Sequence, residues 1–233
     1  MRKFVALVVG ALVMVPVASR AQGGMKEKDP DVKVGGGVLA KGWQARVDFP
    51  EAPPAGRGQK VEDLRFEDMS GGFHITSGPH AIYWNPANVA KGNYTVHATM
   101  AKTKATPHEE SYGIFMGGTH LNEPNQNYLY CVVFGAGDYM VRHRYGTEVH
   151  TLQGKTPNDA VSKAAENGSA KDDIALTVSN DKVSCSINGK EVWSMPKADA
   201  IGAGKLESTD GIYGLRASHN LNIHVSNFGV TKG

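Results

Sequence analysis

The chain has 233 residues, of which 25 are basic and 23 acidic, so its formal net charge is +2. This near balance gives no electrostatic argument for nucleic acid or an anionic membrane surface as a partner. The length suits one domain of the β-sandwich size class behind a short targeting segment.

The first 21 residues have the pattern of a cleavable signal peptide. Arg2 and Lys3 precede an apolar run of about fifteen residues, and Ser19 and Ala21 are small residues in the positions of a cleavage site. The run is too short to span a bilayer comfortably, so we expect no stable membrane anchor, although a retained anchor helix is the alternative. Cleavage after Ala21 would leave 22 basic against 23 acidic residues, a formal charge of −1.

Export follows from this pattern, and it places the protein in the periplasm or outside the cell. The short Arg-Lys signal is typical of a bacterial host. Residues 22–39 are polar, charged and rich in glycine, which predicts a flexible leader before a domain over residues 40–233. A second irregular stretch, Phe49 to Lys60, contains three prolines and is predicted to be a surface loop.

From about Trp43 onward, apolar and polar residues alternate with a period of two, which is typical of half-buried strands. In the run from Tyr94 to Met100, the alternation places Tyr94, Val96, Ala98 and Met100 on one face. Further strands are predicted over Gly72–Ser77, Ala81–Trp84, Tyr112–Met116, Tyr128–Phe134, Tyr139–Tyr145, Glu148–Leu152, Ile174–Val178, Val183–Ile187, Glu191–Met195, Gly211–Ala217 and Leu221–Val230. About a dozen strands with almost no helix predict an all-β fold, a two-sheet antiparallel β-sandwich of the jelly-roll kind.

Two local patterns are specific enough to test. Asn188-Gly189 lies between two alternating runs, and both residues tolerate the positive φ angles of a type I′ turn, so we expect a β-hairpin there. The one helix candidate is Asn158–Glu166, which follows Pro157 and ends before Gly168.

The two cysteines, Cys131 and Cys185, each lie in a strand-like run without the spacing of a zinc site. In an oxidising compartment they could form a disulfide that stabilises the fold by several kcal/mol. Two buried, unpaired thiols are the alternative.

The carboxyl-terminal third resembles a known superfamily. The segments Ile174–Val178, Lys182–Lys190, Asp210–Arg216 and Leu221–Phe228, in this order, resemble the concanavalin A-like lectin/glucanase superfamily. Within it they are similar to the bacterial branch with the 3-keto-disaccharide hydrolase domain and to laminin G-like jelly rolls. The resemblance covers roughly residues 40–231. Its motifs are glycines for turns and apolar residues for the core, so it implies the fold more strongly than any chemistry.

Catalytic carboxylates are not evident. Glucanases of this superfamily carry a Glu-x-Asp-x-x-Glu strand, and this chain has no such pattern. The nearest acidic clusters are Glu62-Asp63 with Glu67-Asp68, and Glu109-Glu110, for which solvated charge is the simpler interpretation. We therefore assign no catalytic residue and lean away from an enzyme; an active version would be a glycoside hydrolase.

No metal site or cofactor is predicted. The nine histidines include no HExxH or other compact ligand spacing. The resemblance leaves Ca²⁺ as an alternative, bound through loop oxygens such as those of Asp210 or Asn220, but the chain has no EF-type loop.

The candidate binding residues combine amides, arginines and one tryptophan. Between Gly117 and Tyr128 the loop is rich in polar groups that could bridge sugar hydroxyls, namely His120, Asn122, Glu123, Asn125 and Gln126. An ordinary hairpin connection, whose amides cap local backbone groups, is the alternative.

Arg142 and Arg144 alternate along one predicted strand and share a face with Met140. On a concave sheet face they could bind hydroxyls or a uronate carboxylate in bidentate fashion, whereas on a convex face they would be solvated charges. Trp84 could stack on a sugar ring, and its neighbour Tyr83 would then point to the opposite side.

We therefore expect an exported, lectin-like domain that binds a carbohydrate or glycan ligand without hydrolysing it. A glycoside hydrolase of the 3-keto-disaccharide hydrolase type and an adhesive protein-binding module are the alternatives. The sequence specifies neither the ligand nor the oligomeric state.

Overall fold

Strands account for most of the chain that the computed structural model describes, which is residues 30–50 and 58–233. The expected signal peptide and residues 22–29 of the leader lie outside these residues. Asp31 to Gly233 form one compact unit, to which the description below refers. No helix in the described segments is long and apolar enough to cross a bilayer.

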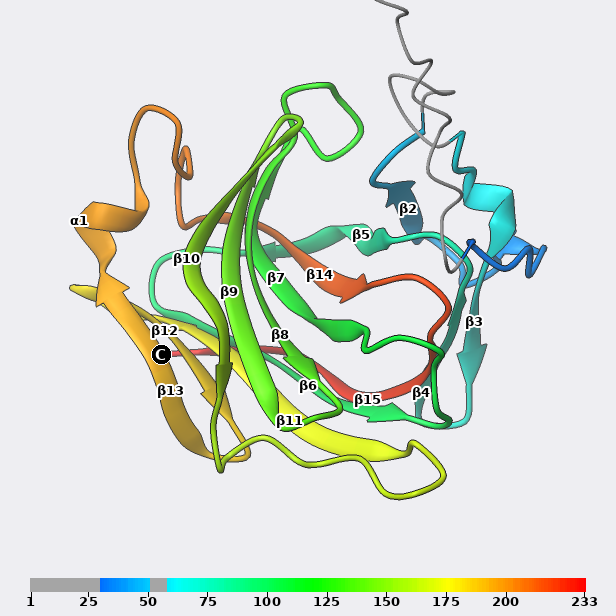
Figure 1. Cartoon of the computed structure of the whole chain (residues 1–233). Coiled ribbons are helices and arrows are strands. Elements are labelled where there is room, and N and C mark those ends of the chain that lie inside the picture. The colour runs from blue at the N-terminus through cyan, green and yellow to red at the C-terminus, as the bar shows by residue number, and fades with distance from the viewer. Residues whose placement is uncertain (1–29, 51–57) are drawn as a thin grey trace, which may run out of the picture. The chain divides into compact units, whose positions relative to one another are not determined.

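Two sheets make up the unit (Figure 1). Over the described residues the larger has eight strands, in the spatial order β1 (Gly37–Val38), β3 (Leu64–Met69), β4 (Gly72–Ser77), β15 (Asn222–Lys232), β6 (Tyr94–Lys102), β11 (Ala170–Val178), β12 (Lys182–Ile187) and β13 (Lys190–Pro196). Neighbouring strands are antiparallel except for β1 and β3.

The smaller sheet has seven strands in the same part of the chain, and all its neighbours are antiparallel. Their order is β10 (Glu148–Pro157), β9 (Asp138–Tyr145), β8 (Asn127–Phe134), β7 (Ser111–Thr119), β14 (Gly211–Ala217), β5 (Ala81–Ala90) and β2 (Gln44–Val47). Two short helical turns complete the described elements, the 3-10 turn η1 (Val61–Asp63) and α1 (Lys197–Ala200). This architecture confirms the expected antiparallel β-sandwich.

The core lies between the two sheets and follows the period of two. Tyr94, Val96, Ala98 and Met100 of β6 are all buried in the main apolar cluster, as the alternation predicts. The same cluster contains inward side chains of the seven-stranded sheet, among them Ile114. Alternate residues of each strand therefore fill one continuous interior.

A disulfide crosses this interior. Cys131 of β8 and Cys185 of β12 are bonded, with their Cα atoms 6.5 Å apart. Because β8 and β12 belong to different sheets, the bond joins the two layers covalently.

The hairpin expected at Asn188-Gly189 joins β12 to β13, and the two residues have φ angles of 50° and 80°. The helix expected over Asn158–Glu166 is wrong, since this segment consists of turns. Its backbone N–H groups bond to distant partners: Ser162 donates to Asp172 Oδ1 at 2.8 Å and Ala164 to the Gly135 carbonyl at 2.7 Å. Such tertiary bonds replace the i to i−4 bonds that a helix needs.

Candidate ligand-binding face

One face of the seven-stranded sheet points away from the eight-stranded sheet, and we call it the outer face. Its apolar side chains form a second cluster, separate from the main core, that consists of Ile82, Trp84, Phe115, Leu121, Tyr128, Tyr130, Val132 and Met140. Their chain neighbours Tyr83, Leu129 and Cys131 point inward into the main core. The alternation of β5 and β8 thus divides their side chains between the two faces.

Arg142 and Arg144 lie on this outer face. In the register of β8 and β9, Arg142 is opposite Tyr130 and Arg144 is opposite Tyr128. The two predicted arginines therefore lie beside two tyrosines that the sequence analysis left out of the binding site.

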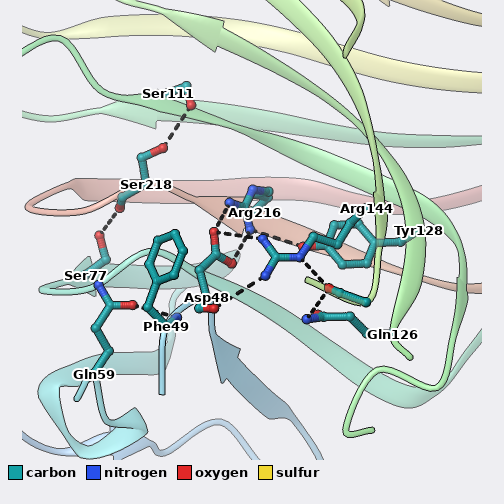
Figure 2. A network of polar contacts seen from close by, with 11 residues as sticks. Asp48, Phe49, Gln59, Ser77, Ser111, Gln126, Tyr128, Arg144, Arg216 and Ser218 are labelled. Atoms are coloured by element: carbon teal, nitrogen blue, oxygen red, sulfur yellow. Dashed lines mark hydrogen bonds and ion pairs between the residues drawn. The ribbon is translucent and has the colours of Figure 1, made fainter. Parts of the chain in front are cut away.

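Asp48, which directly follows β2, binds two arginines from other strands (Figure 2). Its carboxylate accepts two hydrogen bonds from Arg216 of β14, at 3.0 and 2.5 Å, in the bidentate geometry that suits a guanidinium. Arg144 Nη1 lies 3.7 Å from the same carboxylate, and Arg144 Nε donates to the Gly146 carbonyl at 3.0 Å. One carboxylate thus neutralises much of the charge of two cations.

The charges of this group depend on one another. Burial alone would raise the pKa of Asp48, but the neighbouring Arg216 and Arg144 outweigh it and hold the pKa well below its usual value. Arg216 also donates to Tyr128 Oη at 3.3 Å, and its guanidinium carbon lies 4.9 Å from the centre of the Tyr130 ring. This last contact is a cation–π interaction.

Arg142 differs from its neighbours. In the described residues its guanidinium has no hydrogen bond or ion pair, and its Nε is buried without a partner. The side chain as a whole is partly exposed, so a ligand with acceptor oxygens can bind guanidinium nitrogens other than the buried Nε. Arg142 is therefore the strongest candidate on this face for direct ligand contact.

A histidine cluster lies where several strands of the same sheet begin or end. His219 follows β14, and its ring nitrogens lie 3.1 Å from Asp31 and 2.7 Å from Glu110, which precedes β7. These two hydrogen bonds outweigh burial and raise the pKa of His219 to about 10. His80 stacks on it with ring centres 4.8 Å apart, and burial followed by the charge of Arg216 lowers the pKa of His80 to about 4.

Within the described part of the chain, three of the six acidic residues considered for catalysis are paired with cations. Glu110 contacts protonated His219, Glu109 contacts Lys155, and Glu67 contacts Arg65 at 2.7 Å. Over residues 30–50 and 58–233, no group of three or more His, Cys, Asp or Glu side chains could hold a metal ion.

The two oxygens considered for calcium serve as backbone caps. Asp210 Oδ1 accepts from the Gly92 N–H at 2.9 Å, and Asn220 Oδ1 accepts from the Val32 N–H at 2.8 Å. Each thus secures a loop of the fold.

The loop between β7 and β8 crosses the outer face and reaches β2. Leu121 inserts into the outer cluster, Asn122 Nδ2 donates to Gln44 Oε1 at 2.7 Å, and Arg46 Nη1 donates to the Leu121 carbonyl at 3.2 Å. Most polar groups of this loop thus hold it in place, which fits the alternative of an ordinary connection with capping amides.

The remaining predicted loop residues have similar local roles. His120 contacts Glu123 and Glu207, at 3.2 and 3.5 Å. Gln126 is buried and donates to the Gly146 carbonyl at 3.3 Å. Asn125 is exposed.

Trp84 lies in the outer cluster and is 2% exposed, so in this structure it packs as part of that cluster. The structure brings it onto the same face as Arg142 and Arg144, while the loop residues lie along the edge of that face near β2.

Four residues of this face are not predicted as site residues from the sequence: Asp48, Tyr128, Tyr130 and Arg216. For the tyrosines a signal exists, because the run Tyr128–Phe134 is apolar on both of its faces, unlike a strand with one solvated side. Asp48 and Arg216 are 168 residues apart and leave no local pattern.

No family model matches the sequence, and no curated protein matches it. Solved structures match the fold. A carbohydrate-binding module, CBM66 from Bacillus subtilis, has a TM-score of 0.57 at 9% identity, over 84% of this chain and 98% of its own. A protein of unknown function with a galectin-like fold, also from Bacillus subtilis, has a TM-score of 0.55 at 14% identity, over 83% and 90%.

A third similar structure is the exoplasmic/lumenal domain of VIP36 in its Ca²⁺/Man-bound form, with a TM-score of 0.50 at 8% identity, over 82% of this chain and 83% of that one. Identities this low carry information about architecture alone. The chain has a jelly-roll β-sandwich fold, similar to the folds of these three structures.

Proposed function

We propose that this domain is an exported carbohydrate-binding protein, and that it holds an acidic glycan on the outer face of the seven-stranded sheet. The observation that carries the proposal is the contrast among the arginines. Asp48 pairs with Arg144 and Arg216, whereas the Arg142 guanidinium has no partner in the described residues. The positive charge of Arg142 is therefore available to bind a carboxylate ligand.

The aromatic residues support the same interpretation. Tyr130 is cross-strand to Arg142 and 3% exposed, so its ring would help to position the guanidinium for a sugar ligand and would not itself be the stacking surface. Planar rings next to bidentate donors are a common means of binding sugars, and similar sandwiches include a carbohydrate-binding module and a mannose-bound structure.

Binding without hydrolysis is part of the proposal. His219 holds Asp31 and Glu110 in ion pairs, and a glycosidase needs one carboxyl group that can donate a proton. The part of the leader before Asp31 would connect the cleavage site to the compact unit, which begins at Asp31.

The test is a glycan array with residues 22–233 that contains neutral and uronate oligosaccharides, followed by a hydrolysis assay on each ligand bound. We expect binding of uronate glycans, which Arg142→Gln weakens about tenfold or more because a charge-assisted hydrogen bond is lost. Arg65→Gln is the matched control, since it removes a guanidinium from β3 of the other sheet.

Absence of glycan binding would contradict the proposal, as would binding that Arg142→Gln and Arg65→Gln leave equally strong. Release of sugar from a bound ligand would show hydrolysis, and it would favour the alternative function of a glycoside hydrolase over that of a binding protein.

A further inference from the structure

A cavity of about 480 Å³ lies between the sheets, on the side where β10 and β13 are the last strands of their sheets. Its walls come from both layers: Leu129, His143, His150 and Leu152 from the seven-stranded sheet, and Met195 and Ala200 from β13 and α1. The exposed residues Asp199, Ala203 and Lys205 also line it. In Figure 1, β10, β13 and α1 lie on the same side of the unit. The volume is within the range typical of small-molecule sites.

The cavity exists because its two edge strands do not pair. β10 bonds only to β9, and β13 only to β12, in the sheets that the described residues form. The chain after α1 turns back on itself, with Leu206 donating to the Ala200 carbonyl at 3.1 Å. At this edge of the described structure no backbone hydrogen bonds join β10 to β13, so only side chains fill the space between the two sheets.

The hydrogen bonds around the His143 ring, which lines the cavity, determine which of its two nitrogens carries the proton. Asn127 Nδ2 donates to the Lys205 carbonyl at 2.9 Å, so Asn127 Oδ1 must be the acceptor that faces His143 Nε2 at 2.8 Å. His143 Nε2 therefore carries the proton, and Nδ1 carries a lone pair. No group within the described chain donates to Nδ1.

His143 is also uncharged near neutral pH. It is 3% exposed, and its burial together with the neighbouring His150 lowers its pKa to about 4. The ring of His150 lies 5.6 Å away, and His150 Nε2 bonds to Glu148 at 3.0 Å. At Nδ1 the cavity thus presents a neutral acceptor among apolar walls formed by residues such as Leu129, Leu152 and Met195.

We propose that this cavity is a second binding site, for a small uncharged molecule with an apolar body and one hydroxyl group that donates to His143 Nδ1. The apolar walls favour burial of hydrocarbon, and the buried His143 acceptor selects a donor, whereas the side chains of Asp199 and Lys205 are exposed and can keep their contacts with water. A glycan does not fit this description, because its many hydroxyls would lose their hydrogen bonds to water. The site is distinct from the outer face, since His143 points inward between the outward Arg142 and Arg144.

The probes are 2-naphthol, which has an apolar body and one hydroxyl, and 2-methoxynaphthalene, which has no donor. Calorimetric titration of residues 22–233 at neutral pH should show that the methoxy compound binds about five-fold more weakly, the effect expected for one hydrogen bond. His143→Phe should weaken 2-naphthol to the level of the methoxy compound and leave the latter unchanged.

His108→Phe is the matched control, because it makes the same substitution at an exposed loop histidine, and it should bind both probes as the wild type does. Ala203→Phe, in the exposed part of the lining, should fill the cavity and abolish binding of both. This variant and the two probes decide the question even if His143→Phe fails to fold. Failure of 2-naphthol to bind would overturn the proposal, as would equal affinity for the two probes or undiminished binding to Ala203→Phe.

Discussion

The inner and outer faces of the seven-stranded sheet are made by the same strands but differ in chemistry. On β8, Leu129 and Cys131 point inward to an apolar interior, while Tyr128 and Tyr130 point outward toward arginines. The inner face is stabilised by burial of apolar surface and by a disulfide. The outer face contains a network in which one carboxylate holds two cations.

The difference indicates a division of tasks within one sheet. Apolar packing needs no particular partner, whereas each buried charge needs a specific one. We therefore expect changes on the inner face, away from the cavity at His143, to affect stability alone, and changes on the outer face to affect stability only where they break the Asp48 network.

The largest effect should come from the inner face. Replacing both Cys131 and Cys185 with Ala removes a cross-link across 54 residues, which by the chain-entropy account lowers the free energy of unfolding by about 4 kcal/mol. Urea denaturation of the oxidised wild type and the double variant measures the difference. A loss below about 1 kcal/mol would mean that the bond constrains the unfolded chain little.

The next effect should come from Asp48. Asp48→Asn leaves the buried guanidinium of Arg216 without its counter-ion, and we expect a loss of about 3 kcal/mol in urea denaturation at pH 7. The control is Asp210→Asn, in which the new amide oxygen can still accept the hydrogen bond from the Gly92 N–H. It should change the free energy of unfolding by well under about 1 kcal/mol. If the two variants were equally stable, the ion pairs of Asp48 would not contribute measurably to the stability of the fold.

A third effect should appear only at high pH. His219 has a pKa of about 10 in the folded chain, above the value of about 6.5 for an unperturbed histidine. Its stabilisation is therefore complete below about pH 6.5 and is lost as the pH rises toward 10. The urea midpoint of the wild type should fall across this window, and that of His219→Gln should fall less. Parallel curves for the two proteins would exclude a contribution from His219.

The parts of the fold that depend on local pattern could be predicted from the sequence. The alternation from Tyr94 to Met100 and the turn at Asn188-Gly189 each depend on residues a few positions apart, and the structure has both. The helix expected over Asn158–Glu166 fails because partners outside the segment take its N–H groups.

The candidate site was less predictable for the same reason. Arg142 and Arg144 could be placed on one face, but whether each has a counter-ion depends on Asp48, almost one hundred positions earlier in the chain. The amides of the β7–β8 loop suggested a ligand, and several of them instead hold the loop against β2 and the neighbouring turns. Composition alone does not distinguish an amide that binds a ligand from one that caps the backbone.

The disulfide also has a mechanical consequence. A ligand on the outer face would pull on β8 and β9 of the seven-stranded sheet, and the disulfide joins β8 to β12 in the other sheet. Apart from the connecting loops of the chain, the Cys131–Cys185 bond is the covalent link between those layers in the described residues. Force that pulls the two sheets past each other would be shared between this bond and the connecting loops, so the sheets would resist sliding apart.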